Sequence, residues 1–251
     1  MNNEQYIKYN GNRTKVLSCD PKASGGIVLD DTVTTICECA FRDCKKITEL
    51  NIPESIAYIE EDAFKDCSGI ETVHIPSQLL FLGQGAFAYC YNIKDVKIDS
   101  PLSSLEKYTF AGCNSLEWID LVEGILEFGE EVFFNCTSLK EIQIPSTVEK
   151  IGDGAFSECK KIKELVFPAN LKYIGNGVFS GMTSLREIVC LGSLPPETPQ
   201  QPSRKIAAGT ITIPSWQEKV KLYVPEDSAK AYEAHPFWGN FEIECLLDDI
   251  D

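Results

Sequence analysis

Cysteine is the residue type in this chain that offers the most chemistry. The sequence holds 11 cysteines but only two histidines, His74 and His235. A thiolate can act as a nucleophile when a base lies beside it, and it can also bind a soft metal or form a disulfide. Which of these reactions is open to the chain depends on the elements that position the thiols.

Three cysteines near the N-terminal end come closest to a metal-binding motif. Cys37, Cys39 and Cys44 have the spacing Cys-x-Cys-x₄-Cys. A structural zinc site takes four ligands, and both histidines are far away in sequence. Because a fourth ligand is missing, we expect no metal site and no cofactor.

Six cysteines belong instead to a tandem repeat that is marked by phenylalanine. One phenylalanine recurs every 23 residues, at Phe41, Phe64, Phe87, Phe110, Phe133, Phe156 and Phe179. The residue three positions later is Cys44, Cys67, Cys90, Cys113, Cys136, Cys159 and, in the last copy, Met182. A fixed period of this length is typical of a solenoid, in which a small unit buries its apolar face against copies of itself.

The spacing within one repeat predicts its backbone. Phenylalanine, cysteine and an aliphatic residue at i, i+3 and i+6 favour a tight, 3₁₀-like turn. The apolar residues nine and eleven positions after each phenylalanine indicate a strand with one buried face. Proline follows this strand at Pro53, Pro76, Pro145 and Pro168, and glycine marks a predicted bend at Gly83, Gly129, Gly152 and Gly175. The predicted fold class is an α/β repeat solenoid, a right-handed coil of about seven 23-residue repeats with parallel strands and short 3₁₀ or helical turns, capped at both ends.

This placement limits what the cysteines can do. Within an inward column of Phe and Leu, cysteine acts as a small hydrophobe, so we expect free, buried thiols. A disulfide ladder between stacked copies is the alternative, although parallel Cβ vectors make bridging poor. His74 falls on an exposed strand position, away from the inward thiols, and the known catalytic motifs are missing. We therefore predict a chain that is not an enzyme.

The repeat resembles a known family. Residues 139–144 read Leu-Lys-Glu-Ile-Gln-Ile, a Leu-x-x-Leu-x-Leu pattern, and residues 155–162 read Ala-Phe-Ser-Glu-Cys-Lys-Lys-Ile. Together these runs resemble the BspA-like, Treponema-pallidum-type leucine-rich repeats, and the likeness covers about residues 27–191. The resemblance implies a surface or secreted protein that binds host components as an adhesin does. The polar first residues, 1–13, resemble no signal peptide, so a cytoplasmic location is the alternative.

The domain organisation follows from the repeat. Residues 1–26 are predicted to form an N-terminal cap, with a hairpin about Asn10-Gly11 and a degenerate coil. The leucine-rich-repeat solenoid spans residues 27–191. A Pro-rich loop, residues 193–206, and a C-terminal cap with a short helix near residues 227–234 occupy 192–251. A monomer is expected.

Charge excludes two classes of partner. The formal net charge is −15 and the sequence pI is about 4.6. Nucleic acid demands a basic stripe, which this sequence lacks, and the same charge disfavours an anionic membrane surface. An acidic surface also keeps a long solenoid soluble. No run of 18 apolar residues is present, so we expect no membrane insertion.

The outward strand positions are the candidate binding surface, because repeat proteins usually bind through such faces. Eight residues after each phenylalanine stand Glu49, Thr72, Asp95, Trp118, Glu141, Glu164 and Glu187; ten residues after stand Asn51, His74, Lys97, Asp120, Gln143, Val166 and Val189. An exposed tryptophan in an acidic column is typical of a binding anchor. The predicted site on a concave face is Trp118, Asp95, Glu141, His74, Asp120 and Lys97, and its partner is a protein or a glycan. Sequence drift at Trp118, or packing of its ring on Asp95 and Glu141, is the alternative.

A second candidate surface lies around the turns. Tyr89, Tyr91 and Phe134 stand where other copies carry polar or small residues, so they are a predicted aromatic patch. Scattered exposed aromatics are also common on ordinary surfaces. Two functional classes remain open: a non-catalytic binding scaffold, or a structural segment of a surface or multi-protein assembly without a discrete ligand.

Overall fold

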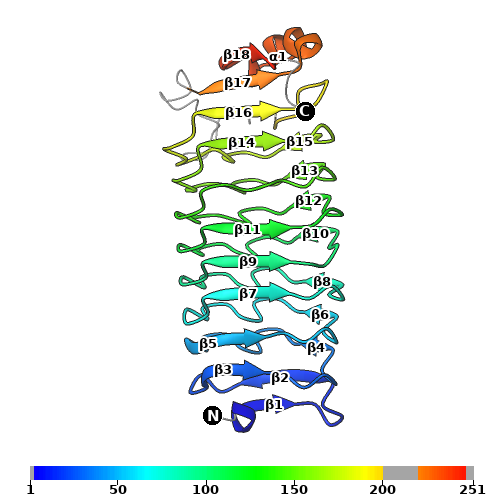
Figure 1. Cartoon of the computed structure of the whole chain (residues 1–251), viewed down its shortest axis with the longest axis vertical. Coiled ribbons are helices and arrows are strands. Elements are labelled where there is room, and N and C mark those ends of the chain that lie inside the picture. Colours follow the sequence, from blue (N-terminus) through cyan, green and yellow to red (C-terminus); the bar gives the residue numbers. More distant parts are fainter. Residues whose placement is uncertain (1–2, 200–219, 247–251) are drawn as a thin grey trace.

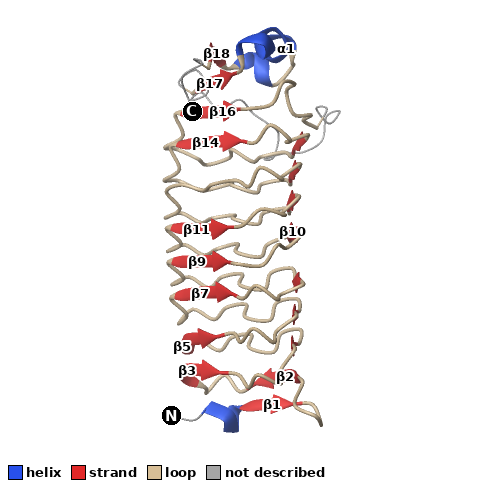
Figure 2. Cartoon of the chain, turned by 45° about the vertical axis from the view of Figure 1, so that its right-hand side comes forward, coloured by secondary structure: helices blue, strands red, loops and turns tan. Residues whose placement is uncertain are grey.

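The computed structural model describes residues 3–199 and 220–246, which form one elongated stack of coils (Figure 1). Each coil climbs along the long axis, and every strand of one side lies beside its counterpart in the next coil. Both views show a nearly straight stack (Figures 1 and 2). The predicted concavity is therefore not evident, and we call the surface carrying the longer strands the strand face.

Two sets of strands line the stack. The strand face carries β3 (Ser24–Val28), β5 (Lys46–Asn51), β7 (Thr72–Ile75), β9 (Asp95–Ile98), β11 (Trp118–Leu121), β14 (Glu164–Phe167), β16 (Glu187–Cys190), β17 (Lys221–Val224) and β18 (Glu242–Cys245). The second side carries β2 (Lys15–Cys19), β4 (Thr35–Ile36), β6 (Tyr58–Ile59), β8 (Phe81–Leu82), β10 (Ser104–Leu105), β12 (Glu127–Phe128), β13 (Lys150–Ile151) and β15 (Tyr173–Ile174). Most neighbours pair in parallel and in register with the repeat, as where Trp118 faces Asp95. The ladders break between β5 and β7, between β8 and β10, and between β11 and β14. The predicted parallel strands are confirmed.

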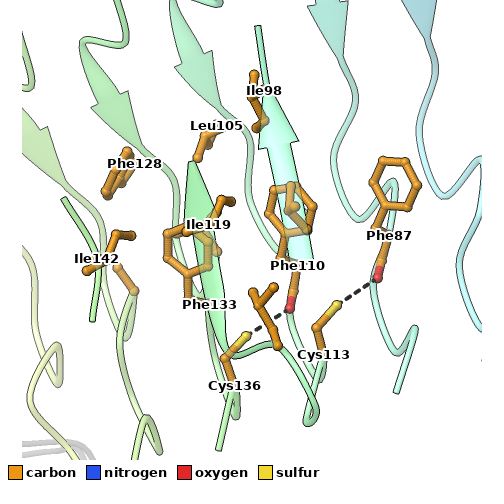
Figure 3. Close-up of a cluster of buried hydrophobic side chains, with 14 of the residues drawn as sticks. Phe87, Ile98, Leu105, Phe110, Cys113, Ile119, Phe128, Phe133, Cys136 and Ile142 are labelled. Carbon is orange, nitrogen blue, oxygen red and sulfur yellow. Dashed lines mark hydrogen bonds between the residues drawn. The ribbon is translucent and has the colours of Figure 1, made fainter. Parts of the chain in front are cut away.

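The phenylalanine column forms the axis of the core. Consecutive rings from Phe41 to Phe156 stack nearly parallel, with centroids 5.0 to 6.0 Å apart. These rings are fully buried and lie between the two sets of strands (Figure 3). Burying a Phe, Leu, Ile or Val side chain is worth roughly 1.5–3 kcal/mol, so the inward columns hold the stack together.

The cysteine column lies inside, as predicted. Cys113 donates its thiol to the Phe87 carbonyl at 3.3 Å, and Cys136 donates to the Phe110 carbonyl at 3.3 Å (Figure 3). The thiols of Cys67, Cys90 and Cys159 do the same at 2.9 to 3.2 Å. Each thiol thus joins its own coil to the preceding one. A cysteine suits this position because it is small, apolar and able to donate.

The turns around each phenylalanine are short and 3₁₀-like, as predicted. Hydrogen bonds of the i→i+3 type are present, as from the Cys44 amide to the Phe41 carbonyl at 3.0 Å. Residues two positions before and after each phenylalanine, however, take left-handed φ angles, as at Asp62 (52°) and Asp66 (62°). Two such residues per repeat prevent a continuous helix. The fold is therefore a β-solenoid with little helix, which confirms the predicted solenoid of parallel strands and short turns.

The repeat glycines also act differently from the prediction. A Cβ atom at Gly129 would lie 2.6 Å from the Lys107 amide nitrogen, and one at Gly152 would lie 2.7 Å from that of Glu130. The backbone of the preceding coil leaves no room for a side chain there. These glycines permit close stacking of coils, and their φ angles are not in the left-handed region.

The N-terminal cap contains the predicted hairpin. The 3₁₀ turn η1 (Asn3–Tyr6) leads into β1 (Ile7–Tyr9), which pairs antiparallel with β2. β2 in turn pairs in parallel with β4, so the hairpin covers the first coil. The degenerate coil predicted before the first phenylalanine is formed by β3 and β4.

The C-terminal cap closes the other end with aromatic rings. It contains η3 (Glu226–Ser228), α1 (Ala229–Ala234) and η4 (Trp238–Asn240), which confirms the short helix near residues 227–234. Trp238 is fully buried against Phe179 and donates its indole N–H to the Pro196 carbonyl at 3.0 Å. β17 and β18 extend the parallel sheet beyond the seventh repeat, so the stack has more coils than predicted. Part of the predicted loop, 200–206, lies outside the described residues.

Candidate binding site on the strand face

The hydrogen-bonded ladder of the strand face is interrupted beside Trp118. β7, β9 and β11 form one sheet, and β14, β16, β17 and β18 form another. Residues 141–144, the corresponding segment of the coil between them, are assigned to no strand. Within the described residues, the last backbone bond on this path runs from the Lys140 amide to the Glu117 carbonyl at 3.1 Å. The strand that the sequence predicts over residues 139–144 is therefore not formed, because this segment lacks the backbone hydrogen bonds that would join it to β11.

The exposure of the apolar side chains beside this interruption also indicates an opening. Leu121 and Ile144, which face each other across the interruption, are only partly buried, whereas Ile98 and Phe167 at equivalent positions are fully buried. The backbone groups of 142–144 have no backbone partner among the described residues. An unpaired amide must be solvated or bound, since burying it without a partner costs about 1–3 kcal/mol.

The opening forms a cleft of about 180 Å³. It brings together three of the predicted site residues, and its lining is Trp118, Ile119, Asp120, Leu121, Glu141, Ile142 and Gln143. Gln143 was not among the predicted site residues, although it stands in the same outward column as Asp120. The indole of Trp118 is 49% exposed, so it is not covered by its acidic neighbours.

The other predicted site residues lie further along the same face. Asp95 pairs in register with Trp118, and Lys97 pairs with Asp120. Lys97 is, however, engaged by Asp99, whose carboxylate lies 3.0 Å from its Nζ atom and 2.7 Å from Nε2 of His74. The hydrogen bonds from His74 and Lys97 lower the pKa of Asp99. Asp99 is a site residue that the prediction missed; its one signal was that it replaces the strand-ending proline.

His74 contributes to a second, wider cleft. This space of about 580 Å³ lies where β5 and β7 fail to pair, and its lining includes Asp30, Asp31, Asn51 and Glu54. His74 therefore belongs to a different opening from Trp118. The six predicted residues therefore do not form one site. Trp118, Asp120 and Glu141 line the smaller cleft, with Asp95 beside Trp118 on β9. His74 lines the wider cleft, and Lys97 is paired with Asp99.

Ion pairs occur on both sets of strands, as between Lys221 and Glu244 on the strand face, but they leave out the acidic residues around Trp118. Lysine and glutamate residues pair between neighbouring coils: Lys94 with Glu71, Lys107 with Glu130, Lys140 with Glu117, Lys150 with Glu127 and Lys172 with Glu149. Within the described residues, no lysine or arginine forms such a pair with Asp95, Asp120 or Glu141. Glu164 and Glu187 even face each other in register. The face therefore has an uncompensated negative charge.

The second predicted patch is only partly assembled. Tyr89 and Tyr91 are exposed and their ring centroids lie 6.2 Å apart. Tyr89 also covers Gly112, where an added Cβ would lie 2.5 Å from its ring. Phe134 is half-buried, and no ring contact joins it to either tyrosine within the described residues. The two tyrosines form a pair that excludes Phe134.

The deeply buried thiols are poorly suited to chemistry where they lie. Burial raises the pKa of Cys113 to about 12 and that of Cys190 to about 12. Thiols of this kind remain protonated near neutral pH, so they are weak nucleophiles and weak metal ligands. Among residues 3–199 and 220–246, no three Cys, His, Asp or Glu side chains are arranged to hold a metal ion.

Parallel strand ladders, a 23-residue period and inward columns define a leucine-rich-repeat solenoid. The family model described as the BspA type leucine rich repeat region matches residues 23–136 and 81–195, in six copies. These matches cover more than half of the sequence. The chain belongs to the BspA-type leucine-rich-repeat family.

Solved structures share the fold. A leucine-rich repeat protein from Eubacterium ventriosum is 21% identical with a TM-score of 0.67, and the match covers 71% of this chain and 48% of that one. The T. pallidum leucine rich repeat protein is 23% identical with a TM-score of 0.50, over 75% of this chain and 79% of that one. This chain thus matches about half the length of the Eubacterium ventriosum protein.

No curated protein matches the sequence. In the described part of the chain, no helix combines the length and the apolar character that crossing a bilayer requires.

Proposed function

We propose that this chain is a non-catalytic binding scaffold that holds a protein or glycan partner on its strand face at Trp118. The observation that carries the proposal is the cleft beside β11, where an exposed indole, two carboxylates and unpaired backbone groups meet. A rigid solenoid presents such groups without a cost for ordering them, and preorganisation raises affinity. Membership of the BspA-type family supports a repeat scaffold.

The proposal includes a place of action. Membership of the BspA-type family favours a protein that acts at the cell surface or after secretion, as an adhesin. In that setting the unpaired acidic residues of the strand face meet extracellular partners. Within the described residues, Asp95, Asp120 and Glu141 take no part in the ion pairs that join neighbouring coils, so their carboxylates remain free for binding.

A structural role is the second candidate. In that case the chain is a segment of a larger surface assembly, and contacts are made by the caps. The buried aromatic cluster at the C-terminal end, which packs Phe237 and Trp238 on Phe179, favours this role because it gives the cap a fixed shape against which a neighbouring segment packs. The two roles differ in whether Trp118 contributes to binding.

The experiment compares two aromatic truncations. Trp118→Ala removes the proposed anchor, and Tyr58→Ala removes a ring of similar exposure, 45% against 49%, from the second side of the stack. Glycan arrays and immobilised extracellular matrix proteins identify a ligand, and calorimetry then measures its affinity. We expect at least a tenfold loss for Trp118→Ala, as for an interface hot spot, and less than a twofold change for Tyr58→Ala. Equal affinities for the wild type and Trp118→Ala would favour the structural role.

A further inference from the structure

The cleft beside Trp118 has the dimensions of a pocket for one side chain. Its volume of about 180 Å³ is smaller than the roughly 300–1,000 Å³ of pockets that enclose whole small molecules. The groups around it are a π face, from Trp118, and acceptors, from Asp120 and Glu141. A group that is both flat and cationic satisfies all of them at once.

The guanidinium group of arginine has this combination of properties. It stacks on tryptophan, and it donates in a fork that matches a carboxylate. Neither carboxylate of the cleft has a lysine or arginine partner within the described part of the chain, and the nearby Lys97 is held by Asp99. The cleft therefore lacks the cation that its groups favour.

The surroundings favour an extended peptide as the carrier of that arginine. An extended peptide rises about 3.3 Å per residue with alternate side chains on one side, so it can place one side chain in the cleft and reach the acidic positions further along the strand face. Further along the face, Glu164 and Glu187 lie opposite each other on β14 and β16. Like charges directly opposite are destabilising, and a second basic side chain there would relieve the repulsion.

We propose that the strand face binds a basic, extended peptide segment whose arginine enters the cleft between Trp118 and Glu141. The inference rests on the proposed binding function, and it names the chemistry of the partner. A peptide supplies the cation that the cleft lacks, whereas a neutral glycan would stack on Trp118 but leave both carboxylates uncompensated.

The test uses the full chain and a synthetic nine-residue peptide, blocked at both ends, in which three arginines alternate with threonine. Calorimetry at low salt measures its affinity, and the same peptide with citrulline in place of arginine is the ligand control. We expect saturable binding of one arginine peptide per chain and at least a tenfold weaker binding of the citrulline peptide. Lysine in place of arginine should weaken binding several-fold, because an ammonium group cannot form the stacked fork.

Matched variants separate the cleft from general attraction by negative charge. Glu141→Gln and Glu149→Gln each remove one charge, but Glu149 pairs with Lys172 outside the cleft. We expect at least a tenfold loss for Glu141→Gln and for Trp118→Ala, and less than twofold for Glu149→Gln. Equal losses for the two glutamine variants, or binding that does not saturate, would overturn the inference.

The outcome can be distinguished from failure of the proposed function. A glycan or neutral protein that needs Trp118, together with absent binding of the arginine peptide, would overturn the peptide inference and leave the binding face intact. If no glycan, matrix protein or arginine peptide depends on Trp118, both proposals fail.

Discussion

Individual buried residues in this solenoid stabilise the contact between one coil and the next. Five buried thiols, from Cys67 to Cys159, each donate to a phenylalanine carbonyl of the preceding coil, so one small side chain fills space and satisfies a backbone acceptor. The 23-residue spacing of phenylalanine predicted this inward column. The hydrogen bonds could not be predicted, because they depend on how closely one coil approaches the next.

The buried thiols predict a loss of stability at alkaline pH. The pKa of Cys113 is raised from 9.0 to about 12, so above pH 9 the unfolded chain loses this proton while the folded chain keeps it. Stability is therefore fully present below pH 9 and falls as the pH rises toward 12, by about 1.4 kcal/mol per pH unit for one such thiol. Urea unfolding at pH 8, 9 and 10 measures this slope.

Cys113→Ala is the matched variant for this measurement. It costs stability at every pH because it removes a buried group, but it should lose less between pH 8 and pH 10 than the wild type by about 1 kcal/mol. Parallel stability curves for the two proteins would show that the thiol is exposed or ionised in the folded state.

At the scale of elements, the strand face is defined by where its ladder fails. The repeat pattern predicted strands over both 118–121 and 141–144, since Ile142 and Ile144 fit the apolar columns as well as their counterparts do. The structure pairs the first segment with β9 and leaves the second unpaired. Sequence periodicity predicts whether a side chain points inward or outward. It does not predict the distance between neighbouring coils, and backbone hydrogen bonding depends on that distance.

The candidate site was likewise predictable only in part. Trp118, Asp120 and Glu141 were identified because they stand in outward columns, and they do line one cleft. Asp95 pairs with Trp118 from the neighbouring strand. His74 fell in the same columns, but it lies at another opening, because outward columns run along the whole stack.

The interrupted ladder makes a direct prediction about hydrogen exchange. Amides of 142–144 have no backbone acceptor in the part of the chain that the structure describes. In the free chain they should therefore exchange with solvent much faster than the amides of β9 and β14, by roughly a hundredfold or more. Exchange monitored by mass spectrometry, with peptides that cover 141–144 and 95–98, provides the comparison. Equal protection of the two segments would mean that the ladder is continuous in solution and that the cleft is closed.

At the scale of the whole molecule, the stack is a rigid, acidic rod that is closed at both ends. A hairpin covers the first coil, and aromatic rings around Trp238 cover the last. In a solenoid each coil contacts only its neighbours, so an opening between two coils can persist without disturbing distant ones. The net charge is −15. Within the described residues, the unpaired carboxylates of Asp95, Asp120 and Glu141 place part of it on the strand face, where it attracts cationic partners.

The central claim is that a partner binds on the strand face at the opening beside Trp118. Hydrogen exchange of the full chain, recorded with and without a saturating ligand, either the arginine peptide or a captured partner, tests it most directly. The account predicts new protection at residues 118–121 and 141–144, with none at β3 or β6. Ligand binding that leaves 141–144 unprotected, or that protects only the second side of the stack, would contradict it.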